Sequence, residues 1–317
     1  LVAATRYMIM NLLASGLVLL GIAMLYGITG HLLMEPLQAA VREIYQTGRY
    51  SQPLTVVVAL ITVGLGIKSA LFPFHTWAPD TYAFAPPMSS AILSGIISKA
   101  YIFLLIKFFY RVIGFDIISQ FHIDSFLFYC GLAGMIMGSV MAISQRDIRR
   151  MVAYSSVAQI GYVYMGLGMA SMAGVAAALF QMLAHAAAKS LLFLSTHELV
   201  SVSGNHKHFH YLHGAGYRNV AAGIVFTVSA MSMVGIPFTG GFIAKLYLAS
   251  AAIPLGGSMR VLVLIALAVS TLLNAVYFLH TVVSIYRRPA EDVLYPPARH
   301  IPRYVVSALF VSMLIIV

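Results

Sequence analysis

The sequence predicts an all-α fold, a polytopic bundle of membrane-spanning helices, on three observations. Hydrophobic residues make up 61% of the 317 residues and charged residues only 9%, whereas a soluble domain is roughly 25% charged. Mean hydropathy is +0.91. The apolar runs are continuous and about 20 residues long, enough to cross a hydrocarbon core, whereas barrel strands alternate over ~10 residues. An ordinary soluble domain and a disordered chain are therefore excluded.

Three full spans are expected in the first third of the chain. Residues 7–28 form an uninterrupted apolar run. The polar segment that follows is expected to be a loop. The second span, 54–78, contains Pro73, which removes a backbone donor and kinks a helix. A short loop that includes Asp80 then leads to the third span, 88–110.

Five more full spans and one partial span are expected in the rest of the chain. The full spans are 125–144, 151–170, 174–200, 220–252 and 259–286. The seventh is interrupted at Pro237, and the partial span starts near Tyr304 and covers 304–317. The chain begins with Leu1, shows no signal peptide, and ends inside a run of about 14 apolar residues, too short to cross a bilayer. We therefore expect residues 1–317 to be a single transmembrane domain cut from a longer membrane protein.

The loop charges predict the orientation of the chain. Net charge is +10, and more of the basic residues lie in the loops 145–150, 201–219 and 287–303 than in the loops of the opposite side. By the positive-inside rule these three loops are expected to be cytoplasmic, in the cell (inner) membrane. Apolar helices separate the basic loops, so no continuous stripe for nucleic acid is expected.

Four lysines lie well inside apolar runs: Lys68, Lys99, Lys189 and Lys245. An ammonium group at bilayer depth costs ~2.5 kcal/mol or more, so these lysines require a reason. The alternatives are snorkelling of the side chain to the interface and static ion pairing. Because each lies roughly two turns or more from its helix end, we favour a role in transport.

A buried lysine can release its proton, whereas arginine cannot. His185 and Lys189 are i,i+4 neighbours on one helix face. A hydrogen-bonded core histidine is the alternative for His185, but its place one turn from a buried lysine favours a relay. The predicted proton relay consists of Lys68, Lys99, His185, Lys189 and Lys245.

The two interrupted spans give a second signal for transport. Pro73 follows Lys68 closely, and Pro237, Gly240 and Gly241 precede Lys245. Broken backbone at membrane depth is tolerated where protein or a hydrated cavity surrounds it, and transporters use such helices in matched repeats. A simple proline kink without an ion role is the alternative.

The sequence predicts no metal site and no cofactor. The loop that contains His206, His208, His210 and His213 has a spacing that could hold Zn²⁺ or Ni²⁺. No carboxylate or cysteine lies near it, and the single cysteine, Cys130, allows no disulfide within the chain. We find no flavin, quinone, haem or nucleotide motif, so no electron-transfer chemistry is expected in this chain itself.

Four segments together carry a family resemblance. They are KSALFPFHTWAPDTYAFAPPMSSAILSGIISKAY, RDIRRMVAYSSVAQIGYVYMGLG, HAAAKSLLFL and GIPFTGGFIAKLYL. They resemble the antiporter-like, proton-conducting membrane subunits of respiratory complex I, membrane-bound hydrogenases and multisubunit Na⁺/H⁺ antiporters. The resemblance implies a fragment of a 14-helix fold with two inverted repeats and two discontinuous helices. Residues 1–110 would end the first repeat, and 125–286 would form the second.

The resemblance also implies roles for single residues. Lys68 corresponds to the lysine of the first discontinuous helix and Lys99 to the central residue of the next helix. His185 and Lys189 correspond to the HxxxK helix, and Lys245 to the terminal lysine of the second discontinuous helix. The family's glutamate that pairs with the first lysine would lie before residue 1, and Asp80, expected in a loop, does not replace it.

The first stretch of the chain and Lys99 look most like the D subunit of the cation/proton antiporters. The expected function is therefore ion translocation in such an antiporter, with protons and Na⁺ as the ions and other membrane subunits and the lipid bilayer as partners. A proton-pumping subunit of a complex I-like or hydrogenase complex is one alternative, which would make the chain part of an NADH:quinone oxidoreductase-type translocase. A structural subunit without transport, a carrier of organic solutes and a metal-dependent membrane enzyme are others.

Overall fold

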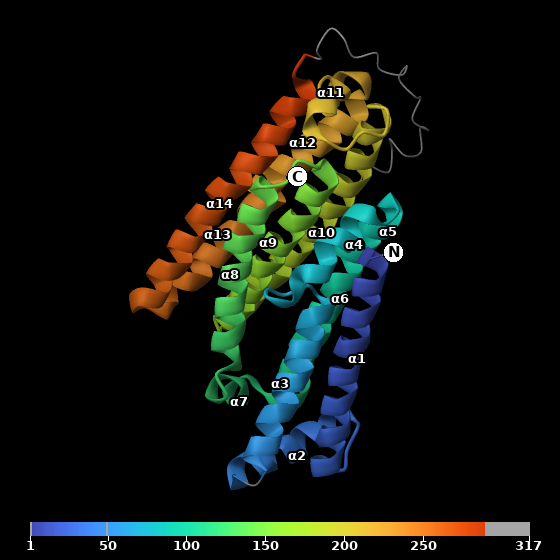
Figure 1. The fold of residues 1–317 in the computed structure, drawn as a ribbon. Coiled ribbons are helices and arrows are strands. Elements are labelled where there is room, and N and C mark those ends of the chain that lie inside the picture. The colour runs from blue at the N-terminus through green and yellow to red at the C-terminus, as the bar shows by residue number, and fades with distance from the viewer. Residues whose placement is uncertain (1, 49, 289–317) are drawn as a thin grey trace.

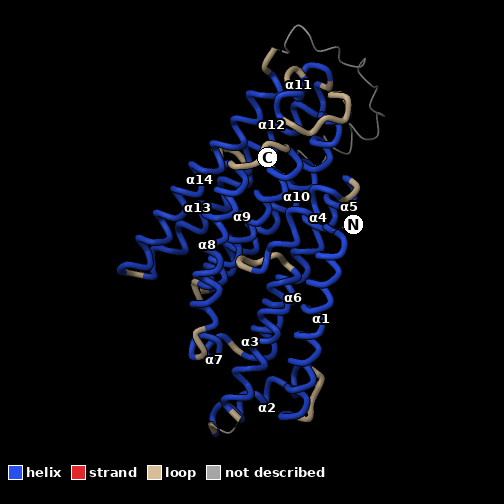
Figure 2. The backbone as a smooth tube through the Cα atoms, viewed as in Figure 1, coloured by secondary structure: helices blue, strands red, loops and turns tan. Residues whose placement is uncertain are grey.

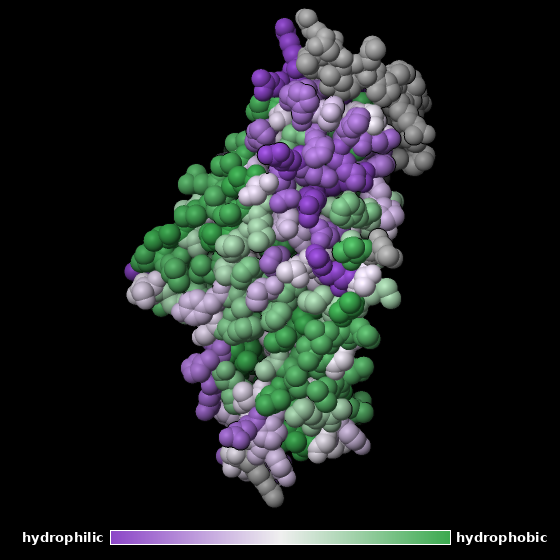
Figure 3. Space-filling view, in the orientation of Figure 1, coloured by the Kyte–Doolittle hydropathy of each residue, from purple (hydrophilic) through white to green (hydrophobic). Residues whose placement is uncertain are grey.

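A computed structural model describes residues 2–48 and 50–288. It shows a slanted, elongated bundle of helices (Figure 1) and confirms the predicted all-α membrane fold. No strand occurs in the described residues. Their helices are joined mainly by short loops (Figure 2). Hydrophobic side chains cover the middle of the visible face, and hydrophilic ones gather toward its two ends (Figure 3), the distribution expected of a protein that crosses a bilayer.

The first part of the chain is coloured from blue through cyan to the dark green of α7 (Figure 1). Its elements are α1 (Val2–Thr29), α2 (Met34–Thr47), α3 (Ser51–Lys68), the 3₁₀ turn η1 (Phe74–Thr76), α4 (Trp77–Phe84), α5 (Pro87–Ile92), the π-helical turn η2 (Leu93–Ile97), α6 (Ser98–Phe108), a second π-helical turn η3 (Phe109–Ile113) and α7 (Phe115–Gln120). The elements from α5 to η3 follow one another without a gap, as one rod over Pro87–Ile113.

The second part forms the green to red side. Its elements are α8 (Ile123–Ile143), α9 (Ile148–Gly168), α10 (Met172–Ser201), the 3₁₀ turn η4 (Phe209–Leu212), α11 (Ala215–Arg218), α12 (Val220–Val234), α13 (Gly240–Ala252), the 3₁₀ turn η5 (Ile253–Leu255) and α14 (Gly257–Tyr286).

Six of these helices are long and apolar enough to cross a membrane: α1, α3, the Pro87–Ile113 rod, α8, α10 and α14. The fifth expected span folds as α9, a helix of 21 residues that is more polar than the other six. The seventh is divided into two shorter apolar helices, Val220–Val234 and Gly240–Leu255. The partial span expected near Tyr304, with the loop 287–303 beyond Arg288, lies outside the described residues.

One segment expected to be a loop is a helix. In α2, Leu37, Val41 and Ile44 are buried at i, i+4 and i+7, so the helix is amphipathic. It packs against the second π-helical turn, where Gln38 Nε2 donates a hydrogen bond to the Tyr110 carbonyl at 3.2 Å. Charged residues on the outer face hid this apolar stripe in the sequence.

Helix α9 occupies the centre of the second part and is buried over nearly its whole length. It packs closely on α8 because small residues face each other. A Cβ added at Gly161 would lie 2.5 Å from the Met135 nitrogen, and one at Gly138 would lie 2.6 Å from the Ala158 nitrogen. Small residues of this kind let membrane helices approach backbone to backbone. The polar side chains of α9 are thereby brought next to α8, α10 and α14.

Asp80 does not lie in a loop, as expected from the sequence, but in the first turn of α4. Its two carboxylate oxygens each form an ion pair, with Arg6 of α1 at 2.6 Å and with Arg150 of α9 at 2.7 Å. A carboxylate in the first turn of a helix also meets the positive end of the helix dipole. Asp80 therefore connects the helix that follows the first break to both parts of the bundle.

Candidate functional site

Lys99 lies two residues after a distortion in its helix. The turn Leu93–Ile97 is π-helical, and such turns change the hydrogen-bonding register of an α-helix and often mark functional sites. The Lys99 ammonium donates to the Ser94 carbonyl and, at 3.3 Å, to Ser98 Oγ. The residue is only 7% exposed. The π-helical turn thus supplies an acceptor for a cation that has left water.

Lys189 and His185 lie on α10, one turn apart and fully buried. The Lys189 ammonium donates to the Val152 carbonyl at 2.8 Å and to Ser155 Oγ, both on α9. Neither ring nitrogen of His185 has a hydrogen-bond partner among the described residues. The charges of Lys99 and Lys189 both act on His185, so the three groups form one electrostatic cluster.

A chain of hydroxyl and carbonyl groups joins the two buried lysines. Ser94, whose carbonyl binds Lys99, places its Oγ 3.1 Å from Ser156 Oγ of α9. Ser156 Oγ donates in turn to the Val152 carbonyl at 3.3 Å, the same oxygen that accepts from Lys189. The Pro87–Ile113 rod can come this close to α10 because Gly95 has no side chain. A Cβ there would lie 2.4 Å from Ser190 Oγ.

The second break holds Lys245. Helix α12 ends at Val234, α13 begins at Gly240, and Pro237 lies between them. The Lys245 ammonium donates to the Val234 carbonyl at 2.6 Å, to the Met233 carbonyl at 3.3 Å and to Thr271 Oγ1 of α14 at 3.1 Å. Carbonyls in the last turn of a helix have no partner within the helix and carry partial negative charge. The break therefore provides the acceptors for this ammonium.

The first break follows Lys68 directly. Helix α3 ends at that residue, so the expectation that each lysine lies two turns or more from its helix end is wrong for Lys68, because the break ends its helix early. Pro73 lies in the non-helical segment before η1. Trp77 Nε1 donates to the Ile67 carbonyl at 2.8 Å, and Ser69 Oγ lies 2.6 Å from the Tyr164 hydroxyl of α9. Side chains of the protein thus form hydrogen bonds with the backbone and side-chain groups at the break, as is required within a membrane. The half-buried Lys68 places its ammonium 5.0 Å from the Tyr101 ring centre, a cation–π contact.

Within residues 2–48 and 50–288, no carboxylate forms an ion pair with a lysine; both ion pairs belong to Asp80. Lys99, Lys189 and Lys245 are held by carbonyl and hydroxyl oxygens instead. An ammonium paired with a carboxylate leaves an unpaired buried anion when it loses its proton, which is costly. Neutral acceptors impose no such penalty, so this arrangement can take up and release protons.

A polar face on α14 was not predicted from the sequence. Its buried members include Ser270, Asn274, Tyr277 and Thr281. They recur at i, i+4, i+7 and i+11, so the spacing in the apolar run 259–286 could have revealed one polar helix face. Asn274 Oδ1 accepts from Tyr277 at 2.6 Å, and Asn274 Nδ2 donates to the Tyr162 hydroxyl at 3.3 Å. The Lys245 ammonium lies 5.3 Å from the ring centre of the same Tyr162. Tyr162 therefore connects the polar face of α14 to the second break.

The four histidines of the loop 201–219 lie against aromatic rings and against the segment 145–150. No group of three or more His, Cys, Asp or Glu residues in the described part of the chain is placed to hold a metal ion. The rings contact one another and a tyrosine: the His206 ring stacks on Tyr211 with the ring centres 4.4 Å apart, and the His210 and His213 rings meet edge-on with their centres 5.6 Å apart. The loop contacts the segment 145–150 through the Asp147–His208 bridge, so these two basic loops lie at the same end of the bundle.

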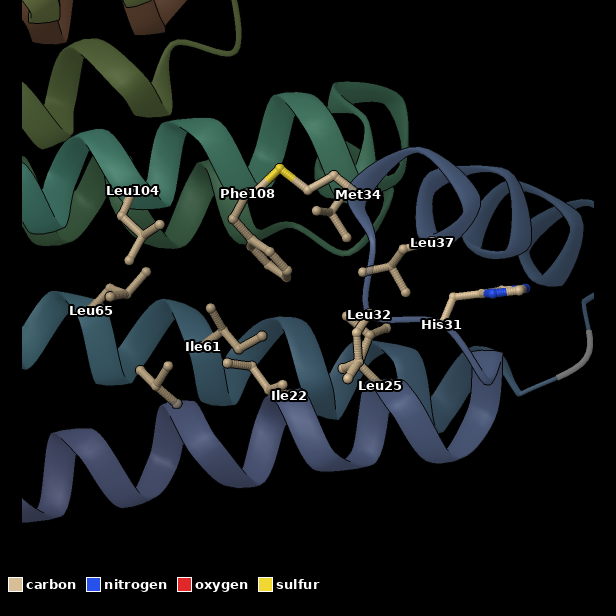
Figure 4. A pocket seen from close by; sticks show the side chains of 12 residues that line it. Ile22, Leu25, His31, Leu32, Met34, Leu37, Ile61, Leu65, Leu104 and Phe108 are labelled. Carbon is tan, nitrogen blue, oxygen red and sulfur yellow. The ribbon is translucent and has the colours of Figure 1, made fainter.

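An apolar cavity of about 190 Å³ lies apart from the lysines, between α1, α2, α3 and α6 (Figure 4). Its walls include Leu25, Ile61, Leu65 and Phe108, with His31 at the edge. The lining offers no group for proton transfer other than this histidine. The cavity is therefore not part of the polar site.

Residues 1–274 match the family described as NADH:quinone oxidoreductase/Mrp antiporter, transmembrane. The chain is 33% identical over its full length to NADH-quinone oxidoreductase subunit N of Desulforudis audaxviator, of which it covers 63%. It is also 33% identical, over 90% of its length, to subunit N 1 of Solibacter usitatus, of which it covers 57%. The chain thus spans about three fifths of the length of these curated relatives.

Solved structures give the same fold. A chain of the Mrp complex from Dietzia superposes on 94% of this chain with a TM-score of 0.79 and 28% identity, and 52% of that chain is covered. A chain of the membrane-bound sulfane sulfur reductase, an archaeal respiratory membrane complex, gives 0.81 and 25% identity over 99% of this chain and 62% of its own length. A chain of respiratory complex I from Thermus thermophilus gives 0.74 and 25% identity, with coverages of 100% and 66%.

Proposed function

Because the chain belongs to the NADH:quinone oxidoreductase/Mrp antiporter transmembrane family, we propose that it carries protons across a membrane as part of an ion-translocating subunit. The proposed relay consists of Lys68, Lys99, His185, Lys189 and Lys245. It requires no catalytic chemistry in this chain. The protons move between lysine, histidine and hydroxyl groups.

The observation that carries this proposal is the link between Lys99 and Lys189. Ser94, Ser156 and the Val152 carbonyl place the two buried ammonium groups in one polar region, and neither group has a carboxylate partner among the described residues. Carbonyl oxygens only accept hydrogen bonds, so the proton itself must pass through the hydroxyl groups, His185 or water. A subunit that serves only as a scaffold has no use for such groups, because each is costly to keep in a membrane. Proton transfer gives both groups a purpose.

The charges also suggest how the steps are coordinated. The charge of Lys99 acts on Lys189, and both lysines act on His185. Like charges in a low-dielectric interior repel each other strongly, so a proton that arrives on one lysine favours release from the other. His185, whose ring nitrogens have no partner in the described residues, can accept the proton between them. The proton then moves on from Lys99 through His185 to Lys189, and the two lysines do not both stay charged.

We place the subunit in the cell (inner) membrane, with the loops 145–150, 201–219 and 287–303 on the cytoplasmic side. The mutual contact of the first two loops supports a common side for them. The relatives are subunits of NADH-quinone oxidoreductases, and the structural neighbours include a chain of an Mrp complex. Two assemblies therefore follow: a cation/proton antiporter that exchanges Na⁺, which the D-subunit-like segments favour, and a redox-driven proton pump, which the named relatives favour.

The test uses the full-length subunit in its complex, reconstituted in vesicles. Lys99→Ala should abolish ion-coupled pH change, because it removes a central titratable group. Lys107→Ala is the matched control on the same helix, where the side chain is exposed and near the helix end. Both variants should assemble. Normal transport in Lys99→Ala would refute the relay.

The driving force separates the two assemblies. Vesicles that acidify or alkalinise in response to a Na⁺ gradient alone would indicate the antiporter. Vesicles that respond only when NADH or another reductant is supplied with an electron acceptor would indicate the redox pump.

A further inference from the structure

A half-buried arginine of α9 is hydrogen-bonded to a half-buried histidine of α10. Arg149 Nη2 lies 3.0 Å from His197 Nδ1. A guanidinium only donates hydrogen bonds, so Nδ1 must be the acceptor, and the imidazole must be neutral with its hydrogen on Nε2. A protonated ring has no acceptor and would place a second positive charge beside the guanidinium. The contact therefore forms in only one protonation state of His197.

The groups around the contact make it responsive to protonation. Arg149 opposes a positive charge on His197, and the carboxylate of Glu198, the next residue of α10, favours one. Asp147 acts on Arg149, and its Oδ1 accepts a hydrogen bond from the Arg149 nitrogen at 2.8 Å. On its other side Arg149 lines a small cavity with Tyr82, whose hydroxyl stays neutral near pH 7. Because His197 is only half-buried, it can exchange protons with water at the end of the bundle with the basic loops.

The contact joins the two helices that hold Lys189 and its acceptors. On α9, Arg149 lies one turn before Val152, whose carbonyl accepts from the Lys189 ammonium at 2.8 Å. On α10, His197 follows Lys189 at a distance of about 12 Å along the helix axis. Helices α9 and α10 thus meet through polar groups at two levels. The outer contact, Arg149–His197, contributes to the spacing of the helices at the inner one.

We propose that the Arg149–His197 contact is a pH-sensitive clamp that keeps the acceptors of Lys189 in place. While His197 is neutral, it accepts a hydrogen bond from Arg149, and the clamp is closed. When a proton from the water binds to His197 Nδ1, the imidazolium and the guanidinium repel each other, and the start of α9 separates from α10. The Val152 carbonyl then moves away from Lys189, and transport slows in acid. The inference rests on the proposed relay and adds to it a site of regulation.

The pH profile of transport tests the clamp. His197→Gln keeps an acceptor for Arg149, the amide oxygen, but has no group that titrates. Initial rates are measured for the full-length subunit in its complex, in vesicles with the same pH on both sides, between about pH 7.5 and about pH 5.5. Over this range wild-type transport should fall about fivefold more than that of His197→Gln, because an ordinary histidine titrates near pH 6.5. At the alkaline end of the range the two proteins should transport equally.

His206→Gln is the matched control. His206 is an exposed histidine at the same end of the bundle, and its ring stacks on Tyr211 rather than on a charged group. This variant should keep the acid inhibition of the wild type. If acid inhibits His197→Gln as strongly as it inhibits the wild type, His197 is not the group that is titrated, and the clamp is refuted.

Glu198→Gln gives a second, independent reading, because it removes the carboxylate that favours the protonated ring. Acid inhibition should remain, but its midpoint should move to lower pH by roughly half a unit. An unchanged midpoint would contradict the assignment of the titration to His197. Loss of transport in Lys99→Ala, together with a wild-type pH profile in His197→Gln, would refute the clamp and leave the relay in place. Normal transport in Lys99→Ala would refute the relay itself.

Discussion

Lys245 shows at the scale of a single residue how the fold accommodates a cation in the membrane. Its ammonium is bound by two carbonyls of the last turn of α12 and by one hydroxyl of α14. These acceptors are uncharged dipoles. They stabilise the charged ammonium, and no unpaired anion is left when Lys245 becomes neutral. A lysine is suited to this position because it can become neutral, which a guanidinium does not do.

We predict that Lys245→Ala abolishes transport while the complex still assembles, because deletion of an isolated charge leaves no partner anion unpaired. Lys245→Arg keeps the charge but fixes it, and it should also fail if the residue must cycle between two protonation states. The measurement is ion-driven pH change in vesicles that contain the complex, with assembly checked separately. Wild-type rates in Lys245→Ala would eliminate the role, and activity in Lys245→Arg alone would reduce Lys245 to a static charge.

At the scale of the elements, distortions of helices supply the acceptors for the lysines. The π-helical turn Leu93–Ile97 presents the Ser94 carbonyl to Lys99, and the end of α12 presents its last carbonyls to Lys245. In a regular helix these oxygens would be occupied by amides of the following turn. Each irregularity therefore has a local purpose, which a straight helix could not fulfil.

Gly235 controls the geometry of the second break. Its φ is +86°, a region that disfavours residues with a side chain, and a Cβ there would lie 2.9 Å from Lys245 Cδ. We predict that Gly235→Ala destabilises the protein by about 1–3 kcal/mol through backbone strain. It should also displace the Lys245 ammonium from the Val234 carbonyl and slow transport.

Thermal unfolding in detergent and vesicle transport check this prediction. Gly27→Ala in α1 is the control, since it has positive-φ strain neither before nor after the change and a Cβ there would meet no atom within 4 Å. Equal stability and equal transport in the two variants would show that the break tolerates a side chain.

At the scale of the whole molecule, one carboxylate connects distant segments. Asp80 pairs with Arg6 and Arg150, so a single side chain ties α1, α4 and α9 together at the end of the bundle with the basic loops. The Asp80 side chain is 18% exposed, and the two arginines are 46% and 39% exposed. Partial exposure weakens each pair, but two guanidinium groups on one carboxylate form a small network.

We predict that Asp80→Asn lowers the free energy of unfolding by about 1 kcal/mol, since it removes a partly exposed pair of charge-assisted contacts. Increasing salt should destabilise the wild type more than this variant, because ions screen the pairs that the variant lacks. Thermal unfolding at low and high salt measures both effects. Asp116→Asn, at an exposed aspartate without an ion pair in the described residues, should change neither quantity.

The sequence by itself determined the all-α membrane fold, the positions of most spans and the lysines inside them. The physical reason is that the bilayer acts along one dimension: about 20 apolar residues cross it, and a charge within such a run stands out at once. Pro73 and Pro237 lie in the non-helical segments after α3 and α12. They indicated the two helix breaks because proline has no backbone N–H to donate within a helix. The family followed from the same segments and is confirmed by the match over residues 1–274.

The tertiary structure alone decided what each of these groups contacts. The acceptors of Lys189 come from α9, and Thr271 reaches Lys245 from α14. Asp80 forms ion pairs with arginines that lie 74 and 70 residues away in the sequence. The amphipathic period of α2 is present in the sequence, but the charged residues of that segment made it look like a loop. The polar period of α14 is also present, but the apolar residues around it made the segment look uniformly apolar. A hydrogen bond within the membrane depends on which helices pack together, and that is fixed by close backbone approach at small residues such as Gly95 and Gly161.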